Sequence, residues 1–316
     1  MVVGTAVLNS CSHANFAPPI TQQTTTTSWV LEYAPARVQE TTYVAISVKN
    51  GDLALLDLLG ENIQLFRNSD FKQQPVTFTA PEDTVSDNQS LCFGDVLWIK
   101  NTDNVFKKMH FDSGVLEDVP ELDDEFYSCL LNQDDSTFFW GRSILVEFGN
   151  NVEKIDLPFD KVSAVSAGSL GDYWVYFEDA GLYHNVEGVW TYFFRADYKY
   201  PAQLVDIFVD QSRAFVLFDR FIEIYDISDP SNNLVVQLNG PSAGIDIVKD
   251  SLGRIWVFTV SGGIWVFENS WSVLVEYPAP STRIFDVAWN IKNERFYVTT
   301  WDGLFSLDIR QVRVAP

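Results

Sequence analysis

Apolar and polar positions along this chain alternate in short runs, and the runs recur at a regular spacing. Aromatic and β-branched segments are separated by turns rich in Gly, Asp and Asn, which is typical of strands joined by hairpins. The clearest copy is DSLGRIWVFT at 250–259, followed by GGIWVF at 262–267. The group recurs about every 40 residues with about four strands in each copy, which predicts the blades of a β-propeller.

Seven copies can be placed on the sequence, and each begins with an apolar strand expected to lie nearest the propeller axis. We find no helical period over about 11 residues, so we expect few helices. The copies span residues 42–80, 90–122, 126–159, 162–194, 204–238, 244–277 and 284–308. We therefore predict an all-β protein, a seven-bladed β-propeller of four-stranded antiparallel blades. Six or eight blades stay open as alternatives, because boundaries read from sequence shift by a few residues.

One strand-like segment lies before the first copy. SWVLEYAP at 28–35 is similar to SWSVLVEYP at 270–278, which ends the sixth copy and leads into the next inner strand. Residues 29–33 would then be the outer strand of the last blade, which joins the two ends of the chain and leaves no open radial edge. The propeller would span 28–316. In the alternative, 312–314 forms that outer strand and 29–33 packs elsewhere.

Residues 1–27 are predicted to form an extended N-terminal arm. The stretch PPITQQTTTT at 18–27 has low complexity and no amphipathic period. Such an arm is either a loose terminus or a tether to a neighbouring subunit. As a tether, its contacts would include Pro18, Pro19, Gln22 and Gln23.

The charge balance changes which partners are expected. The chain has 43 acidic and 21 basic residues and a formal net charge of −22. Phosphate contact needs clustered Lys and Arg, so nucleic acid and anionic membrane surfaces are disfavoured as partners. No apolar run approaches the ~20 residues that cross a bilayer, so we expect no membrane insertion. The acidity either keeps the protein soluble through self-repulsion or offers a face to a basic protein or to divalent cations.

The strongest local charge feature is EDVPELDDE at 117–125. It can be a solvated loop between blades, a surface for a basic partner, or a calcium site, since calcium prefers oxygen ligands. Its spacing matches no EF-hand loop, so we predict an interaction surface and no metal site. The acidic residues of this surface are Glu117, Asp118, Glu121, Asp123, Asp124 and Glu125.

Cysteines are three: Cys11, Cys92 and Cys129. An odd, sparse count does not indicate a disulfide framework. Because Cys92 and Cys129 fall inside apolar runs, we expect both to be buried free thiols. The cysteine usage therefore favours a compartment that is reducing, or at least a protein that does not depend on disulfides.

The sixth copy has a recognisable set of spaced residues. Asp250, Gly253, Trp256, Thr259 and Gly262 follow one another at three-residue steps. This pattern resembles the propeller repeat of two-component regulators, and the fourth and seventh copies keep fragments of it. The resemblance implies a propeller fold and leaves the ligand unspecified.

Motifs for catalysis are not found in the sequence. The histidines are His13, His110 and His184, and no pair has metal-ligand spacing. A nucleophile elbow and a phosphate-cradling glycine loop are also not found. We predict no catalytic, cofactor-binding or metal residue, and no enzyme. We therefore expect a structural, protein-interaction propeller that binds other subunits of a larger assembly, with a phage virion or tail as one setting.

Two other functional classes stay open. One is a propeller that binds or senses a ligand such as a carbohydrate at the mouth of its channel, and the other is a propeller hydrolase or lyase. An enzyme would need carboxylates, Asn or His that converge on the axis. The segment 1–8 lacks the basic region of a signal peptide, so we expect a protein of the cytoplasm or of a virion or other assembly.

Overall fold

The computed structural model describes most of the propeller. The described residues are 15–16, 29–33, 43–57, 62–80, 84, 91–93, 96–103, 105–110, 115–119, 128–131, 137–141, 145–148, 152–167, 172–195, 203–210, 212–238, 244–260, 263–267, 274–277 and 283–312. Within them the chain is built from β-strands, with short 3-10 helices at Arg67–Ser69 and Ile309–Gln311.

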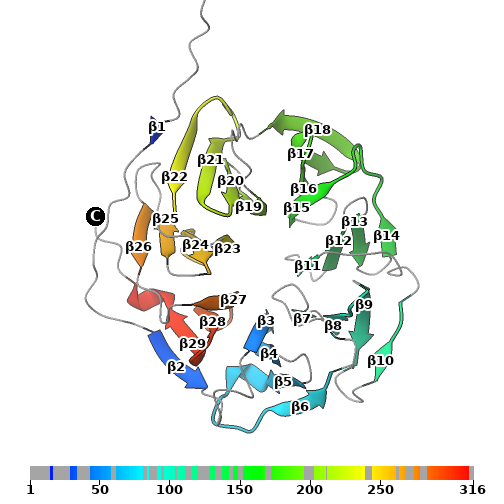
Figure 1. Ribbon diagram of the computed structural model, residues 1–316, viewed down its shortest axis with the longest axis vertical. Helices are drawn as coiled ribbons and strands as arrows, with labels where there is room; N and C mark the ends of the chain where they lie inside the picture. The colour runs from blue at the N-terminus through cyan, green and yellow to red at the C-terminus, as the bar shows by residue number, and fades with distance from the viewer. Residues whose placement is uncertain are drawn as a thin grey trace, which may run out of the picture.

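The strands form seven antiparallel blades, which Figure 1 shows arranged around a common centre. Strands are given from inner to outer. The first blade is β3 (Tyr43–Lys49), β4 (Asp52–Asp57), β5 (Asn62–Phe66) and β6 (Val76–Thr79), and the second is β7 (Leu91–Phe93), β8 (Leu97–Lys100), β9 (Phe106–Met109) and β10 (Leu116–Glu117). The third blade is β11 (Ser128–Leu131), β12 (Thr137–Trp140), β13 (Leu145–Phe148) and β14 (Val152–Lys154), and the fourth is β15 (Val162–Ala167), β16 (Asp172–Phe177), β17 (Gly181–Val186) and β18 (Val189–Phe194).

The last three blades complete the ring. The fifth blade is β19 (Leu204–Val209), β20 (Arg213–Phe218), β21 (Phe221–Asp226) and β22 (Asn233–Gln237). The sixth is β23 (Gly244–Lys249), β24 (Ile255–Thr259), β25 (Ile264–Phe267) and β26 (Leu274–Tyr277). The seventh is β27 (Ile284–Asn290), β28 (Arg295–Thr300), β29 (Gly303–Asp308) and β2 (Trp29–Tyr33). The predicted all-β propeller of four-stranded antiparallel blades is confirmed.

The seventh blade takes its outer strand from the other end of the chain. β2 pairs antiparallel with β29. Glu32 strengthens this pairing, because its Oε1 accepts hydrogen bonds from Arg295 Nη1 at 2.8 Å and from Ser306 Oγ at 2.6 Å. Of the two arrangements that the sequence left open, the structure has the first, and β2 fills the place that 312–314 would have taken.

A second N-terminal segment lies on the rim of the fifth blade. β1 (Asn15–Phe16) runs parallel to β22, with Asn15 opposite Leu234 and Phe16 opposite Val235. In Figure 1, β1 lies beside β22 at the outer edge of the ring. The predicted tether residues Pro18, Pro19, Gln22 and Gln23 lie outside the described residues.

The hydrophobic core lies between neighbouring blades. Trp256 of the sixth blade packs against Phe296 of the seventh, with ring centroids 4.9 Å apart. Phe215 of the fifth blade packs against Phe267 of the sixth, with ring centroids 5.5 Å apart. Every residue of β24 is buried, because each blade is covered on both faces. Double coverage explains why second strands such as β24 have continuous apolar runs in place of strict alternation.

The spaced residues of the sixth copy build its hairpins. Asp250 Oδ2 accepts hydrogen bonds from Arg254 Nε at 2.7 Å and from Trp256 Nε1 at 2.8 Å. Arg254 is 3% exposed and also donates to the backbone oxygens of Ile309 and Val312. The polar groups of Asp250 and Arg254 therefore stabilise the sixth blade and attach the end of the seventh blade to it.

Candidate functional site

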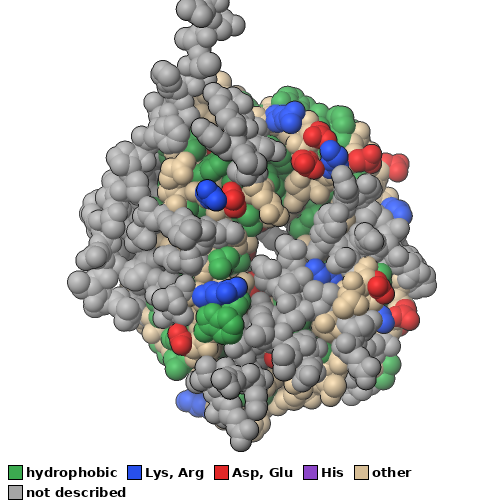
Figure 2. Space-filling model, viewed as in Figure 1, with side chains coloured by type: hydrophobic (Ala, Val, Ile, Leu, Met, Phe, Trp, Pro, Cys, Tyr) green, Lys and Arg blue, Asp and Glu red, His purple; other side chains and the backbone are tan. Residues whose placement is uncertain are grey.

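A cavity of about 450 Å³ lies where the seven inner strands meet, and every inner strand contributes to its wall. Figure 2 views the molecule along this axis. The wall is partly aromatic, through Trp140, Phe208 and Trp289. It is also acidic on one side, through Asp206, Asp246 and Asp286. The volume and the mixture of apolar and polar groups are those of a small-molecule pocket.

The three aspartates occupy the same place in successive blades. They lie one repeat length apart, on β19, β23 and β27, and each follows a register shift near the start of its strand. The sequence analysis did not find this cluster. The cluster could have been recognised from the sequence, because aligning the fifth, sixth and seventh copies places Asp206, Asp246 and Asp286 in one column.

These carboxylates hold neighbouring blades together. Asp286 Oδ2 accepts the backbone N–H of Ile46, in the first blade, at 2.8 Å. Asp206 Oδ2 accepts the backbone N–H of Ile247, in the sixth blade, at 3.2 Å. Each also accepts the N–H of the residue that follows it in its own strand. Asp206 and Asp286 therefore act as links across the fifth-to-sixth and seventh-to-first junctions.

Asp206 and Asp246 form a carboxyl pair. Burial raises the pKa of Asp206 well above its usual value, and the nearby charge of Asp246 raises it further. Burial also raises the pKa of Asp246, while the hydrogen bond from Asp206 lowers it. The two carboxyls therefore share a proton through the hydrogen bond between them, at a pKa raised above the ordinary Asp value mainly by burial.

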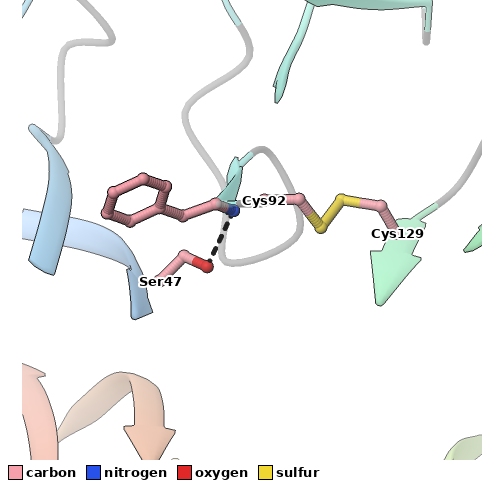
Figure 3. The surroundings of a disulfide bond; sticks show 4 residues. Ser47, Cys92 and Cys129 are labelled. Atoms are coloured by element: carbon pink, nitrogen blue, oxygen red, sulfur yellow. Dashed lines mark hydrogen bonds between the residues drawn. A yellow bond between two sulfur atoms is a disulfide. The ribbon is translucent and has the colours of Figure 1, made fainter. Parts of the chain in front are cut away.

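Two blades use serine for the same linkage. In the first and fourth blades, alanine occupies the aspartate column, at Ala45 and Ala164. Two residues later, Ser47 Oγ accepts the N–H of Phe93 at 3.0 Å, as Figure 3 shows. In the fourth blade, Ser166 Oγ accepts the N–H of Val209, in the fifth, at 3.3 Å. Short polar side chains on inner strands therefore hydrogen-bond to the backbone of the next blade at several junctions of the ring.

The second and third blades are joined by a disulfide. Cys92 on β7 bonds to Cys129 on β11, with a Cα–Cα distance of 6.3 Å (Figure 3). The prediction of two free thiols was wrong, and the argument for a reducing compartment fails with it. The two cysteines are 37 residues apart, about one repeat, so the ring places them opposite each other on adjacent inner strands. Counting cysteines along the chain cannot detect this convergence.

The predicted acidic surface is described in part. Glu117 accepts a hydrogen bond from His110 Nε2 at 2.9 Å, which lowers the pKa of its carboxyl. Asp118 Oδ1 lies 3.6 Å from Lys107 Nζ. Both carboxylates are exposed and contact cations of β9. The other four predicted residues lie outside the described residues: Glu121, Asp123, Asp124 and Glu125.

The described residues have neither a metal-binding cluster nor a membrane-spanning helix. No group of three or more His, Cys, Asp or Glu side chains in this part of the chain is arranged to hold a metal ion. No helix among the described residues is long and apolar enough to cross a membrane.

Comparison with known proteins extends the fold assignment. No protein-family model and no curated protein matches the chain. The virginiamycin B lyase of Staphylococcus aureus, solved as a catalytically inactive variant with quinupristin, is similar in structure. Its TM-score is 0.66 at 13% identity, covering 88% of this chain and 98% of that chain. The WD40 propeller domain of Doa1 gives 0.64 at 12% identity, covering 88% and 95%.

An extracellular domain of a two-component system is also among the similar structures. The extracellular domain of BT4673, a protein of B. thetaiotaomicron assigned to the hybrid two-component systems, has a TM-score of 0.62 at 11% identity. The match covers 88% of this chain and 39% of that chain. The resemblance to two-component propellers indicated by the sixth copy therefore holds at the level of the fold. At these identities, the similarities show that the chain has a β-propeller fold and carry no activity with them.

Proposed function

We propose that this protein is a non-catalytic interaction propeller that works within a larger protein assembly. The observation that carries the proposal is the pairing of β1 with β22. β1 comes from outside the seven blades, and its backbone adds to the outer edge of the fifth. Sheet edges bind extended polypeptides in this way, because main-chain hydrogen bonds supply affinity. A rim that accepts one extended segment is suited to binding others.

The chemistry of the partner follows from charge. A net charge of −22 favours a basic protein subunit over another acidic one. We assign Glu117 and Asp118 to the contact surface and the arm residues to the tether. A phage virion or tail is one assembly in which such a protein would work. Similar propellers include a lyase, a WD40 domain and an extracellular domain of a two-component system, so the choice among functions rests on this chain's own features.

The experiment is gentle isolation of the full-length protein from its source, followed by native mass spectrometry. We expect other subunits at a fixed ratio, and we expect deletion of residues 1–27 to release the propeller from them. The matched control is Asp229→Ala, which changes an exposed turn of the fifth blade. A full-length protein that is isolated as a monomer with no bound subunit would overturn the proposal.

A second candidate function is the binding of a small ligand, which the central cavity favours. The central cavity combines three aromatic side chains with the Asp206–Asp246 pair, which suits a small polar ligand. A ligand bound there would raise the melting temperature of the protein, and Trp289→Ala would remove that rise. A panel of sugars and amines that leaves the melting temperature unchanged would exclude this function for those compounds.

A further inference from the structure

The outer end of the fourth blade carries exposed apolar side chains. We name Phe159, Val186, Val189 and Tyr192 the blade-4 rim patch; they are 43%, 45%, 67% and 53% exposed. Val186, Val189 and Tyr192 come from the hairpin of β17 and β18, and Phe159 comes from the segment before β15. Single exposed apolar residues are ordinary, but these four flank one outer strand on both of its faces. In the register of β17 and β18, Val186 lies opposite Val189 on one face, and Tyr192 lies with Tyr183 and Phe159 on the other, so a strand added along β18 would cover both pairs.

Ring contacts hold this patch in place from beneath. Tyr192 packs on Tyr183 with ring centroids 5.2 Å apart, and Phe159 packs on the same Tyr183 at 5.1 Å. Phe159 also contacts the buried ring of Phe177 at 5.6 Å. Beside them, Trp190 Nε1 donates to the backbone oxygen of Asp156 at 3.1 Å. The Tyr192 and Phe159 face of the patch is therefore preformed, and a partner would not have to order it on binding.

Among the described strands, none pairs with one side of the backbone at the patch. β18 pairs with β17, and no strand among the described residues pairs with the outer side of β18. The outer side of β22 in the next blade, by contrast, is covered by β1. A long exposed edge with apolar side chains invites pairing with another chain. The fourth blade thus combines an open edge with an apolar surface.

The charges around the patch define its partner. Asp156, Asp160, Glu178 and Glu187 are exposed beside the patch residues in sequence or at the adjoining hairpin turns. The nearby Lys161 is engaged by Asp179 at 2.5 Å. Figure 2 shows hydrophobic side chains over the position of β18, with both acidic and basic side chains close by. Two exposed cations, Lys154 and Arg195, also lie near the patch, but these four carboxylates outnumber them. The surroundings therefore keep a net negative charge, which favours basic side chains over acidic ones in an incoming segment.

We propose that the blade-4 rim patch and the outer edge of β18 bind an extended segment of a partner protein that carries apolar and basic side chains. The segment adds as a strand, its apolar side chains cover Val189 and Tyr192, and its cations face the surrounding carboxylates. This inference rests on the proposed function and names the surface that performs it.

The test uses a defined probe and the full-length protein. A fluorescent peptide alternating Lys with Val and Tyr is titrated with the protein, and anisotropy gives the Kd. We expect Val189→Ser with Tyr192→Ser to weaken binding at least about tenfold, since two apolar contacts are lost while the net charge is kept. Ile291→Ser, which changes a 71% exposed residue of the seventh blade, should leave the Kd unchanged. Circular dichroism spectra verify that both variants are folded.

Two further peptides test the other parts of the proposal. Replacing every Lys of the probe by Glu should abolish binding, because the surface is acidic. N-methylation of the backbone along one edge of the probe should also abolish binding, because it removes the donors for strand pairing. Equal binding of either peptide, or equal binding of the original probe to the patch variant, would overturn the proposal. No binding of the probe would overturn it too, and if native mass spectrometry still found fixed subunits, the proposed function would survive.

Discussion

Asp286 shows how much of this ring depends on single side chains. Its carboxylate accepts one N–H from its own strand and one from Ile46 across the junction that closes the ring. The side chain is 7% exposed, so both donors would be left in a poorly hydrated site if it were removed. Buried polar groups that lose their partner carry a desolvation cost.

Asp286→Ala should therefore lower the free energy of unfolding by about 2–3 kcal/mol. Urea denaturation followed by circular dichroism measures this difference. Asp229→Ala, at an exposed turn, is the control and should change stability by less than about 0.5 kcal/mol. Equal effects of the two substitutions would contradict a linking role for Asp286.

The Asp206–Asp246 pair gives the protein a pH-dependent stability. The pKa of Asp206 is raised on folding, so the folded state binds its proton more tightly than the unfolded state does. Stability from this group is present at acid pH and is lost as pH rises from the ordinary Asp value, about 3.9, through the raised value.

Asp206→Asn removes the titrating group but keeps a donor to Asp246. Relative to wild type, we expect the variant to gain stability progressively as the pH rises above the ordinary Asp pKa of about 3.9. Thermal unfolding of both proteins in parallel buffers measures the difference at each pH. A constant difference across this range would show that the carboxyl pair does not share a proton.

At the scale of strands, the inner strands are joined by different chemical means at equivalent places. Aspartate links β19 to β23 and β27 to β3, serine links β3 to β7 and β15 to β19, and a disulfide links β7 to β11. The disulfide replaces one hydrogen bond of this series by a covalent bond, so the second and third blades cannot separate while it is intact.

Reduction of the disulfide should lower the free energy of unfolding by about 4 kcal/mol, because the cross-link closes a loop of 37 residues. Denaturation of the protein with and without dithiothreitol tests this, and Cys92→Ser with Cys129→Ser should match the reduced protein. Cys11→Ser is the control and should have no effect. Alkylation of all three cysteines in the native, unreduced protein would show that the disulfide is absent.

The strands themselves were largely predictable, whereas the contacts among them were not. Periodic apolar runs and turn residues placed each blade, as in 250–267, because local sequence decides strand and hairpin. The pairing of Cys92 with Cys129 depends on the curvature of the ring, which no local pattern contains. The blade-4 rim patch was missed for a similar reason, since Val189 and Tyr192 read as ordinary strand residues until their blade edge is known.

At the scale of the whole molecule, ring closure depends on β2. This strand covers the outer side of β29 and brings Glu32 to Arg295. Without it, β29 would present an unpaired edge and the seventh blade would keep three strands. Residues before β2 contribute to the ring through the short contact of β1 with β22.

Two truncations separate these contributions. A chain that begins at residue 28 should fold and elute as a compact species with a melting temperature within a few degrees of the full chain. A chain that begins at residue 35 should aggregate or melt far lower, because it lacks β2. Size-exclusion chromatography and thermal denaturation measure both. Similar behaviour of the two truncated chains would contradict closure by β2.

The pairing of β2 with β29 also sets when this protein can fold in a cell. β2 is synthesised before the inner strands of all seven blades and β29 after them, so the ring cannot close until β29 has left the ribosome. At a synthesis rate of about 5–20 residues per second, β2 remains unpaired for on the order of tens of seconds before β29 emerges. During that interval its edge is open to other chains, and protection by a chaperone during synthesis would favour the correct closure.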